Sequence, residues 1–275
     1  MYTAEFDYKK ASSLQDALSL LQQHPDAKLL AGGHSLIPAM KLRLAAPSLL
    51  IDISKVPELR GVRMEGNTLI IGAATTYHEL ETNDLVRKAA PLLTEVIPHI
   101  GDPMVRHRGT IGGSLSHADP AADLPAAMLA LGAQMKIQGR SGSRVVDADQ
   151  FFQGMFSTAL GEGEILTEIH IPALSGRQAY EKFPHPASRY AVVGVAVVAG
   201  PEGVRAAVTG AGEHALRLSR LEQALAGKPL NAETIAAACQ NLLSAEGLNH
   251  DLVASAEYRA HLVDVLAKRA LLRLV

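Results

Sequence analysis

The sequence predicts an α+β protein, and two observations carry that prediction. Short apolar segments bounded by turn residues alternate with amphipathic stretches of helical period along the chain. In residues 176–275, three expected strands come first and three expected helices follow. Strands followed by a run of helices indicate a separate α+β domain, with an antiparallel sheet and helices packed on it.

The first expected element is a helix that begins after Ser13. Asp16 lies three residues later, as in a variant of the capping box, and His24-Pro25 ends the helix. Glu65-Gly66-Asn67 is typical of a hairpin turn. Up to residue 100, the other expected elements are strands at 28–31, 49–53, 61–64 and 68–71 and helical segments at 38–44, 77–80, 84–88 and 92–100.

The second part of the chain repeats this mixture. Residues 121–131 are rich in Ala, Leu and Met and predict a helix, and 173–176 resemble a linker. The expected strands are 133–138, 144–146, 165–171, 180–183, 191–198 and 204–209, and the expected C-terminal helices are 216–226, 232–244 and 256–272.

The composition excludes several functional classes. A net charge of −2 and an aromatic content of 4% without tryptophan argue against a nucleic-acid surface. The single cysteine, Cys239, excludes an intrachain disulfide and a self-contained Cys-ligated iron–sulfur cluster. The N-terminus has no apolar signal segment, and the apolar runs at 124–133 and 191–199 are too short for a membrane span. We therefore expect a cytoplasmic protein.

Two glycine segments carry most of the functional information. They are Ala31-Gly32-Gly33-His34-Ser35 and Thr110-Ile111-Gly112-Gly113-Ser114. Paired glycines let a backbone approach a ligand closely, and such a turn gathers N–H groups that suit phosphate oxygens. Two similar segments predict two walls around one elongated ligand that carries phosphate.

Polar residues surround the second glycine segment. Asp102, Arg106, His107, Arg108, His117, Asp119 and Asp123 fall within a short stretch. Histidine and aspartate after a Gly-Gly-Ser turn can reach ribityl or ribose hydroxyls. A metal site at His117, Asp119 and Asp123 is the alternative interpretation; we expect none, because Pro120 makes helical ligand spacing uncertain.

Other motifs have weaker functional interpretations. His34 is either a covalent flavin attachment point or a hydrogen-bonding loop residue, and the second is favoured. Residues 210–215 fit a loose GxGxxA dinucleotide pattern, but a plain strand-to-helix turn is the better interpretation because the neighbouring strands look antiparallel. Cys239 is expected to be a packed small hydrophobe.

Four segments in order resemble one family. They read AGGHSLIPAMKLRL at 31–44, TIGGSLSHADPAADLP at 110–125, GEGEILTEIHIP at 161–172 and YEKFPHPASRYAVVGVAV at 180–197. The chain resembles, over nearly its whole length, the FAD-binding medium subunit of the molybdenum hydroxylases, the group of aerobic carbon monoxide dehydrogenase and xanthine dehydrogenase. No catalytic residue and no metal ligand is expected in it.

The resemblance implies a p-cresol methylhydroxylase-type FAD-binding fold. Two α+β subdomains, 1–55 and 56–175, would hold non-covalent FAD, and a C-terminal α+β domain would span 176–275. By carry-over from the family, residues 29–35 and 110–114 would cradle the pyrophosphate and adjoining parts of FAD. The implied cofactor-binding residues are Leu29, Leu30, Ala31, Gly32, Gly33, His34, Ser35, Leu36, Thr110, Ile111, Gly112, Gly113, Ser114, His117, Asp119, Asp123, Ile165, Leu166, Lys182 and Tyr190.

The resemblance also implies partners. A large subunit would carry the molybdenum cofactor and the substrate pocket, and a small subunit would carry the [2Fe-2S] clusters, in a dimer of heterotrimers. This chain would pass electrons to an external acceptor such as a quinone, oxygen or NAD. Two alternatives stay open: a self-sufficient flavin oxidase with flavin on His34, and an assembly module without cofactor.

Overall fold

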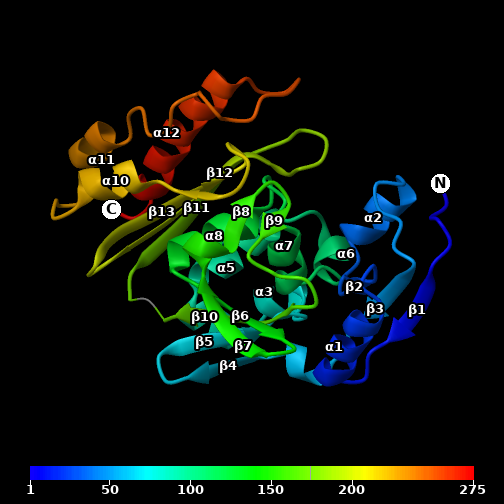
Figure 1. The fold of residues 1–275 in the computed structure, drawn as a ribbon. Helices are drawn as coiled ribbons and strands as arrows, with labels where there is room; N and C mark the ends of the chain where they lie inside the picture. Colours follow the sequence, from blue (N-terminus) through cyan, green and yellow to red (C-terminus); the bar gives the residue numbers. More distant parts are fainter. Residues whose placement is uncertain (174) are drawn as a thin grey trace.

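The computed structural model describes residues 1–173 and 175–275 (Figure 1). Its strands form three main sheets that follow one another along the chain, and helices cover each of them. This mixture confirms the predicted α+β class. Leu174, in the middle of the expected linker, lies outside the described residues.

The N-terminal sheet is parallel and small. Its strand order is β1-β3-β2, and helices α1 and α2 accompany it. The side chain of Ser13 caps α1 by accepting a hydrogen bond from the N–H of Asp16, as its sequence position predicts. The elements of this unit are β1 (Asp7–Lys10), α1 (Leu14–Gln23), β2 (Lys28–Leu30), α2 (Leu36–Lys41), β3 (Leu49–Asp52) and η1 (Pro57–Leu59).

The middle sheet is antiparallel and has five strands in the order β4-β5-β10-β6-β7. Its strands are β4 (Val62–Glu65), β5 (Thr68–Gly72), β6 (Gln134–Gly139), β7 (Gly142–Asp147) and β10 (Ile165–Pro172). Short helices and a two-stranded ribbon lie between them in sequence. These are α3 (Tyr77–Glu81), α4 (Asp84–Ala89), α5 (Pro91–Val96), η2 (Ile97–His99), α6 (Pro103–Arg106), α7 (Ile111–His117), α8 (Asp123–Leu131), α9 (Ala148–Phe151), β8 (Phe152–Gly154) and β9 (Ser157–Thr158).

The C-terminal sheet is antiparallel, in the order β11-β12-β13-β14, as its sequence predicts. Its strands are β11 (Arg177–Pro184), β12 (Ala191–Gly200), β13 (Gly203–Thr209) and β14 (Leu216–Arg217). Three helices follow, and Figure 1 shows them on the sheet face away from α8: α10 (Ser219–Leu225), α11 (Ala232–Ala238) and α12 (Ala256–Leu272).

Helix α8 joins the middle and C-terminal units. Every residue of this helix is buried, Asp123 included. The hydroxyl of Thr209 on β13 donates to the carbonyls of Pro120 and Ala122 just before the helix. One hydrophobic core continues from α8 to residues of the C-terminal sheet such as Ala196. The two units therefore share packing, in which α8 lies against β12 and β13.

The structure corrects some element boundaries. The second glycine segment is the first turn of α7, because Thr110 accepts a hydrogen bond from the N–H of Gly113 and caps a helix. Leu216 begins strand β14 by pairing with β13, so the expected helix starts only at Ser219. Helix α11 ends at Ala238, and the N–H groups of 241 and 242 donate to the carboxylate of Asp264 and not to helix carbonyls. The sequence analysis had not predicted β1, α6, α9, β8 or β9.

Candidate functional site

The first glycine segment links β2 to α2. Gly33 has φ +78°, a left-handed conformation that side chains rarely adopt. Among the described residues, no protein group accepts a hydrogen bond from the N–H groups of Gly32, Gly33, His34 or Ser35. His34 is exposed, and the other three are half-buried. Four successive N–H groups at an accessible turn form a cradle suited to phosphate oxygens.

The two glycine segments meet through backbone contact. A Cβ added to Gly32 would lie 2.2 Å from the carbonyl oxygen of Arg108 and 2.7 Å from the Cα of Gly109. The segment that leads into α7 therefore packs directly on the first turn. Any side chain at position 32 would separate the two walls.

The second glycine segment has a different role from the one expected from its sequence. Its N–H groups donate within the protein, from Ile111 to the carbonyl of Thr75, from Gly112 to that of Ala73, and from Ser114 to that of Thr110. The expected N–H cluster is therefore wrong for this segment. Gly112 is required for packing instead, because an added Cβ would lie 2.5 Å from the Cβ of Ala73.

Gly113 lies on the open side of α7. It is exposed, and the hydroxyl oxygen of Thr110, at 2.8 Å, is the nearest atom that an added Cβ would meet. The buried ring of Tyr77 lies against Gly109, just before this segment, where an added Cβ would lie 2.5 Å from Tyr77 Cε2. Burial raises the pKa of Tyr77, and the charges of Tyr190 and Asp123 raise it further. Tyr77 thus lies beside the second glycine segment.

Asp123 and Lys182 form a buried ion pair across the two units. The distance between Lys182 Nζ and Asp123 Oδ2 is 2.8 Å, and the two side chains are 2% and 5% exposed. Lys182 also donates to the carbonyl of His99 at 3.1 Å, and the hydroxyl of Tyr180 donates to Asp123 Oδ1. Burial raises the pKa of Asp123, although Lys182 and Tyr180 oppose that rise.

Tyr180, His99 and Gly194 are functional candidates that the sequence analysis missed. A Cβ added to Gly194 would lie 2.2 Å from the hydroxyl oxygen of Tyr180, so this glycine makes room for the phenol. The ring of His99 meets that of Tyr180 edge-on at 5.6 Å. Strand alternation could have found Tyr180, since residues 180 and 182 share one face of β11.

The other predicted site residues fall into three groups. Tyr190, 44% exposed, lies near Asp119 and Asp123, whose charges together with burial raise its pKa. The ring of His117 packs on Phe156, with ring centres 5.0 Å apart. The remaining members are Leu29 and Leu30 in β2, Leu36 at the start of α2, and the buried Ile165 and Leu166 at the start of β10.

The alternative metal site is not assembled in the structure. Within the described residues, no group of three or more His, Cys, Asp or Glu side chains could hold a metal ion. The carboxylate of Asp123 is engaged by Lys182 and Tyr180, and Asp119 caps the N–H of Ala121.

Burial raises the pKa of the Cys239 thiol to about 12, as expected for a packed cysteine.

The GxGxxA segment at 210–215 connects two strands of one sheet. Gly210 has φ +82°, and an added Cβ would lie 2.6 Å from the carbonyl oxygens of Ala191 and Val192. The segment leads into β14, so the expected strand-to-helix turn is wrong. Gly210 is needed because a side chain at this position would overlap the neighbouring strand β12.

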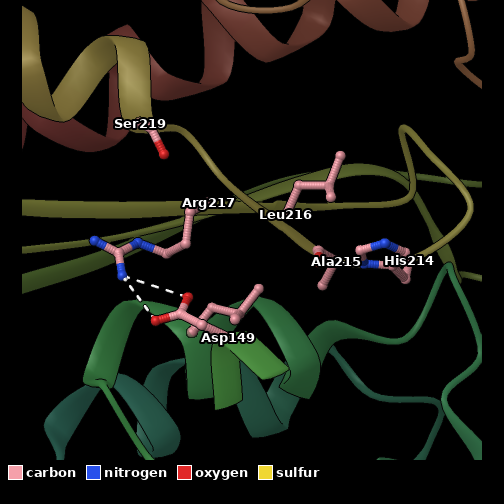
Figure 2. Close-up of a pocket in the computed structure, with 7 residues that line it drawn as sticks. Asp149, His214, Ala215, Leu216, Arg217 and Ser219 are labelled. Atoms are coloured by element: carbon pink, nitrogen blue, oxygen red, sulfur yellow. Dashed lines mark hydrogen bonds and ion pairs between the residues drawn. The ribbon is translucent and has the colours of Figure 1, made fainter. Parts of the chain in front are cut away.

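A cavity of about 450 Å³ opens near this segment (Figure 2). Asp149 of α9 and Arg217 of β14 face each other across it and form an ion pair at 3.3 Å. Arg217 is also paired with Glu222. None of the residues that line this cavity belongs to the predicted cofactor site.

Within the described chain, no helix has both the length and the apolar character that a membrane crossing needs.

Comparison with protein families gives two adjoining matches. Residues 4–174 match the FAD binding domain in molybdopterin dehydrogenase, and residues 178–274 match the CO dehydrogenase flavoprotein C-terminal domain. The carbon monoxide dehydrogenase medium chain of Hydrogenophaga pseudoflava is 41% identical, over 98% of this chain and 97% of that one. The glyceraldehyde dehydrogenase medium chain of Sulfolobus acidocaldarius is 38% identical over 98% of both chains.

Solved structures agree with these matches. The structure of carbon monoxide dehydrogenase from Hydrogenophaga pseudoflava superposes with a TM-score of 0.93 at 42% identity, covering 98% of this chain and 97% of that one. The structure of quinoline 2-oxidoreductase from Pseudomonas putida 86 superposes with a TM-score of 0.94 at 33% identity, covering 100% of this chain and 98% of that one. These matches confirm the family resemblance, the FAD cofactor and the oxidoreductase class. The chain belongs to the family of FAD-binding medium subunits of the molybdenum hydroxylases.

Proposed function

We propose that this chain takes electrons from the iron–sulfur clusters of a partner subunit and passes them, through non-covalently bound FAD, to an external acceptor. The observation that carries the proposal is the N–H cradle at Gly32–Ser35, which has no acceptor in the described part of the chain and is held against the second glycine segment. When bound, FAD supplies the redox chemistry, accepting and releasing electrons. The chain itself binds and orients the cofactor.

The N–H groups of Gly32, Gly33, His34 and Ser35 would hold the pyrophosphate. Hydrogen bonds from backbone N–H groups satisfy an anion without requiring a charged side chain. The missing Cβ of Gly113 would leave space beside α7 for the adjoining part of the cofactor. We assign the pyrophosphate and the adjoining parts of FAD to 29–35 and 110–114, in the proposed subdomains 1–55 and 56–175.

The cluster around Asp123 would hold the other end of the cofactor. His117, Asp119 and Asp123 carry acceptors for cofactor hydroxyls, and Tyr190 would lie near the isoalloxazine ring. Lys182 has one further N–H beyond those given to Asp123 and His99, available to a cofactor oxygen. Ile165 and Leu166 would pass close to the cofactor at the start of β10, and the C-terminal domain at 176–275 contributes Lys182 and Tyr190.

We further propose a large molybdenum-binding subunit and a small [2Fe-2S] subunit as partners, in a dimer of heterotrimers in the cytoplasm. Relatives carry the names of medium chains or subunits of dehydrogenases for carbon monoxide, glyceraldehyde and caffeine. Substrates this diverse on similar medium chains support a substrate pocket on the large subunit. Cys239 alone cannot hold a Cys-ligated cluster, which supports clusters on another chain.

The test is purification of the complex that contains the full chain. We expect a large and a small subunit to copurify, and acid denaturation to release free FAD. Flavin that stays on the denatured chain would favour covalent attachment at His34, and a colourless intact complex would favour the assembly module. For the electron path, the flavin-free Gly113→Val complex should still reduce its iron–sulfur clusters with substrate but lose acceptor reduction. Unchanged acceptor reduction would overturn the relay.

A further inference from the structure

The loop that joins β11 to β12 is closed on itself. The N–H of His185 donates to the carbonyl of Tyr190 at 2.7 Å, and the N–H of Arg189 donates to the carbonyl of His185 at 2.9 Å. Arg189 has φ +62°, an uncommon conformation for a residue with a side chain. The loop therefore depends on local hydrogen bonds to keep its shape.

The ring of His185 adds two further hydrogen bonds to the loop. Its Nδ1 accepts from the N–H of Ala187 at 3.1 Å and from the N–H of Ser188 at 3.2 Å. A backbone N–H can only donate, so Nδ1 carries no proton in this arrangement. These two hydrogen bonds therefore require the tautomer that has its proton on Nε2.

Three other described residues accept hydrogen bonds from the N–H groups two and three positions later, as His185 does. Asn83 accepts from residues 85 and 86, Asn231 from 233 and 234, and Asp251 from 253 and 254. Their acceptors are oxygens that keep this role at neutral pH. His185 differs because histidine is the side chain that ordinarily changes charge between pH 5 and pH 8.

The loop controls where Tyr190 lies. Ala191, the next residue, donates to the carbonyl of Ala121, two residues before Asp123. Burial raises the pKa of Tyr190, and the charges of Asp119 and Asp123 raise it further. Arg189 is near enough to His99 to influence the pKa of that ring. Opening the loop would therefore withdraw Tyr190 from the proposed cofactor site.

Charged and titratable groups face His185 from its neighbours. The carboxylate of Asp251 is paired with Arg259 of α12 at 2.6 Å, and a proton on His185 would contribute to lowering the pKa of Asp251. Arg189 is the other cation of the loop. On β11, Lys182 is committed to Asp123. On α12, Tyr258 packs on Phe183 and stacks with His261.

We propose that His185 is a pH-dependent positioning residue that holds Tyr190 in the cofactor site only while its imidazole is neutral. A proton taken from solvent onto Nδ1 turns the acceptor into a donor, and the bonds from Ala187 and Ser188 break. The consequence for flavin rests on the proposed function, whereas the loop movement does not.

The chain has no tryptophan, which allows a direct test without cofactor. Tyr190→Trp in the full-length chain places one fluorophore at the end of the loop. Accessibility of this tryptophan to acrylamide is measured from pH 8 to pH 5 in three backgrounds: His185, His185→Asn and His185→Ala. His24→Asn, at the end of α1, is the matched control.

With His185 in place, we expect acrylamide quenching of the tryptophan to rise in one transition as the pH falls, and its emission to shift to longer wavelength. With His185→Asn, which keeps an uncharged acceptor, quenching should stay low at every pH. With His185→Ala it should be high at every pH, and His24→Asn should behave like the unmodified chain. A transition that persists in His185→Asn, or no transition with His185, would overturn the proposal.

The flavin half is tested separately on the assembled complex with Tyr190 intact. We expect FAD affinity to fall on acidification with His185 but not with His185→Asn, and to fall about tenfold at neutral pH with His185→Ala, as loss of two hydrogen bonds implies. A complex that binds no FAD at any pH would refute the proposed function while leaving the tryptophan result intact. If the tryptophan shows that the loop moves but FAD affinity is the same in all variants at residue 185, the positioning role is refuted.

Discussion

Lys182 of β11 and Asp123 of α8 form a buried ion pair, 2.8 Å apart, that ties the C-terminal sheet to the middle of the molecule. Tyr180 donates a further hydrogen bond to Asp123, and Lys182 donates a second one to the carbonyl of His99. A buried charge is tolerated when it is paired in this way, and it becomes costly when one partner is removed. The pair is therefore both an interdomain contact and a member of the proposed cofactor site.

Removal of Lys182 should strongly destabilise the chain. We expect Lys182→Met to lower the free energy of unfolding by about 3–5 kcal/mol near neutral pH, because Asp123 is left as a buried charge. Burial already raises the pKa of Asp123, and loss of Lys182 raises it further. A carboxyl whose pKa is raised in the folded state lowers the free energy of unfolding as pH rises through that pKa. The stability lost in Lys182→Met should therefore become smaller on acidification. Urea unfolding from pH 8 to pH 4.5 measures this.

The double variant Asp123→Asn/Lys182→Met is the control for this prediction. It removes both charges, so its deficit should be smaller and should no longer depend on the titration of residue 123. An equal, pH-independent loss in the single and double variants would contradict the role of the charge.

Gly113→Val should empty the cofactor site and spare the fold. The new side chain would occupy the open side of α7 and displace the capping hydroxyl of Thr110, at a cost of about 1–2 kcal/mol. We expect loss of FAD from the purified complex while partner assembly is retained. Gly212→Ala, where an added Cβ meets ordinary contacts from 3.5 Å outward, should retain full flavin. Full flavin content in Gly113→Val would refute our placement of the cofactor.

Gly194 and Tyr180 should be energetically coupled. Gly194→Ala brings a methyl group to 2.2 Å from the phenol oxygen, and we expect a loss of about 1–3 kcal/mol. In the Tyr180→Phe background the overlapping oxygen is gone, so the same change should cost less. The remaining contacts, 3.0 Å to the ring and 3.1 Å to Thr209, make the rescue partial. A double-mutant cycle by urea unfolding measures the coupling, and strict additivity would exclude it.

Glu168 should stabilise the middle sheet in a pH-dependent way. Burial tends to raise its pKa, but hydrogen bonds from His170, Arg63 and Lys136 outweigh burial and lower the pKa to about 2. A depressed pKa contributes stability that is present above pH 4.5 and lost as pH falls toward 2. Glu168→Gln should therefore cost about 2 kcal/mol at pH 7 and less at pH 3. Thermal melts at both values measure it.

The matched control for Glu168 is Glu65→Gln. Glu65 pairs with the same Arg63, but its side chain is 60% exposed. Exposed pairs contribute little, so we expect a change within about 0.5 kcal/mol at either pH. A loss equal to that of Glu168→Gln would show that the pH dependence belongs to Arg63 and not to the buried carboxylate.

The sequence by itself determined the local elements and the family. The Ser13 cap, the hairpin at 65–67 and the long helix at 256–272 depend on neighbouring residues, so a linear pattern predicts them. The order of the four motifs led to the flavoprotein family that the comparisons confirm. The single cysteine already placed any Cys-ligated cluster outside this chain.

Only the tertiary structure decided how the two glycine segments differ. Their sequences are nearly alike. In the described structure, the N–H groups of residues 32–35 have no protein acceptor, whereas those of the second segment donate to Ala73, Thr75 and Thr110. That difference depends on contacts between segments distant in sequence, as do the packing of Gly32 on Arg108 and the pairing of Asp123 with Lys182. Local pattern cannot encode such contacts, because they arise only when separate sheets and helices pack together.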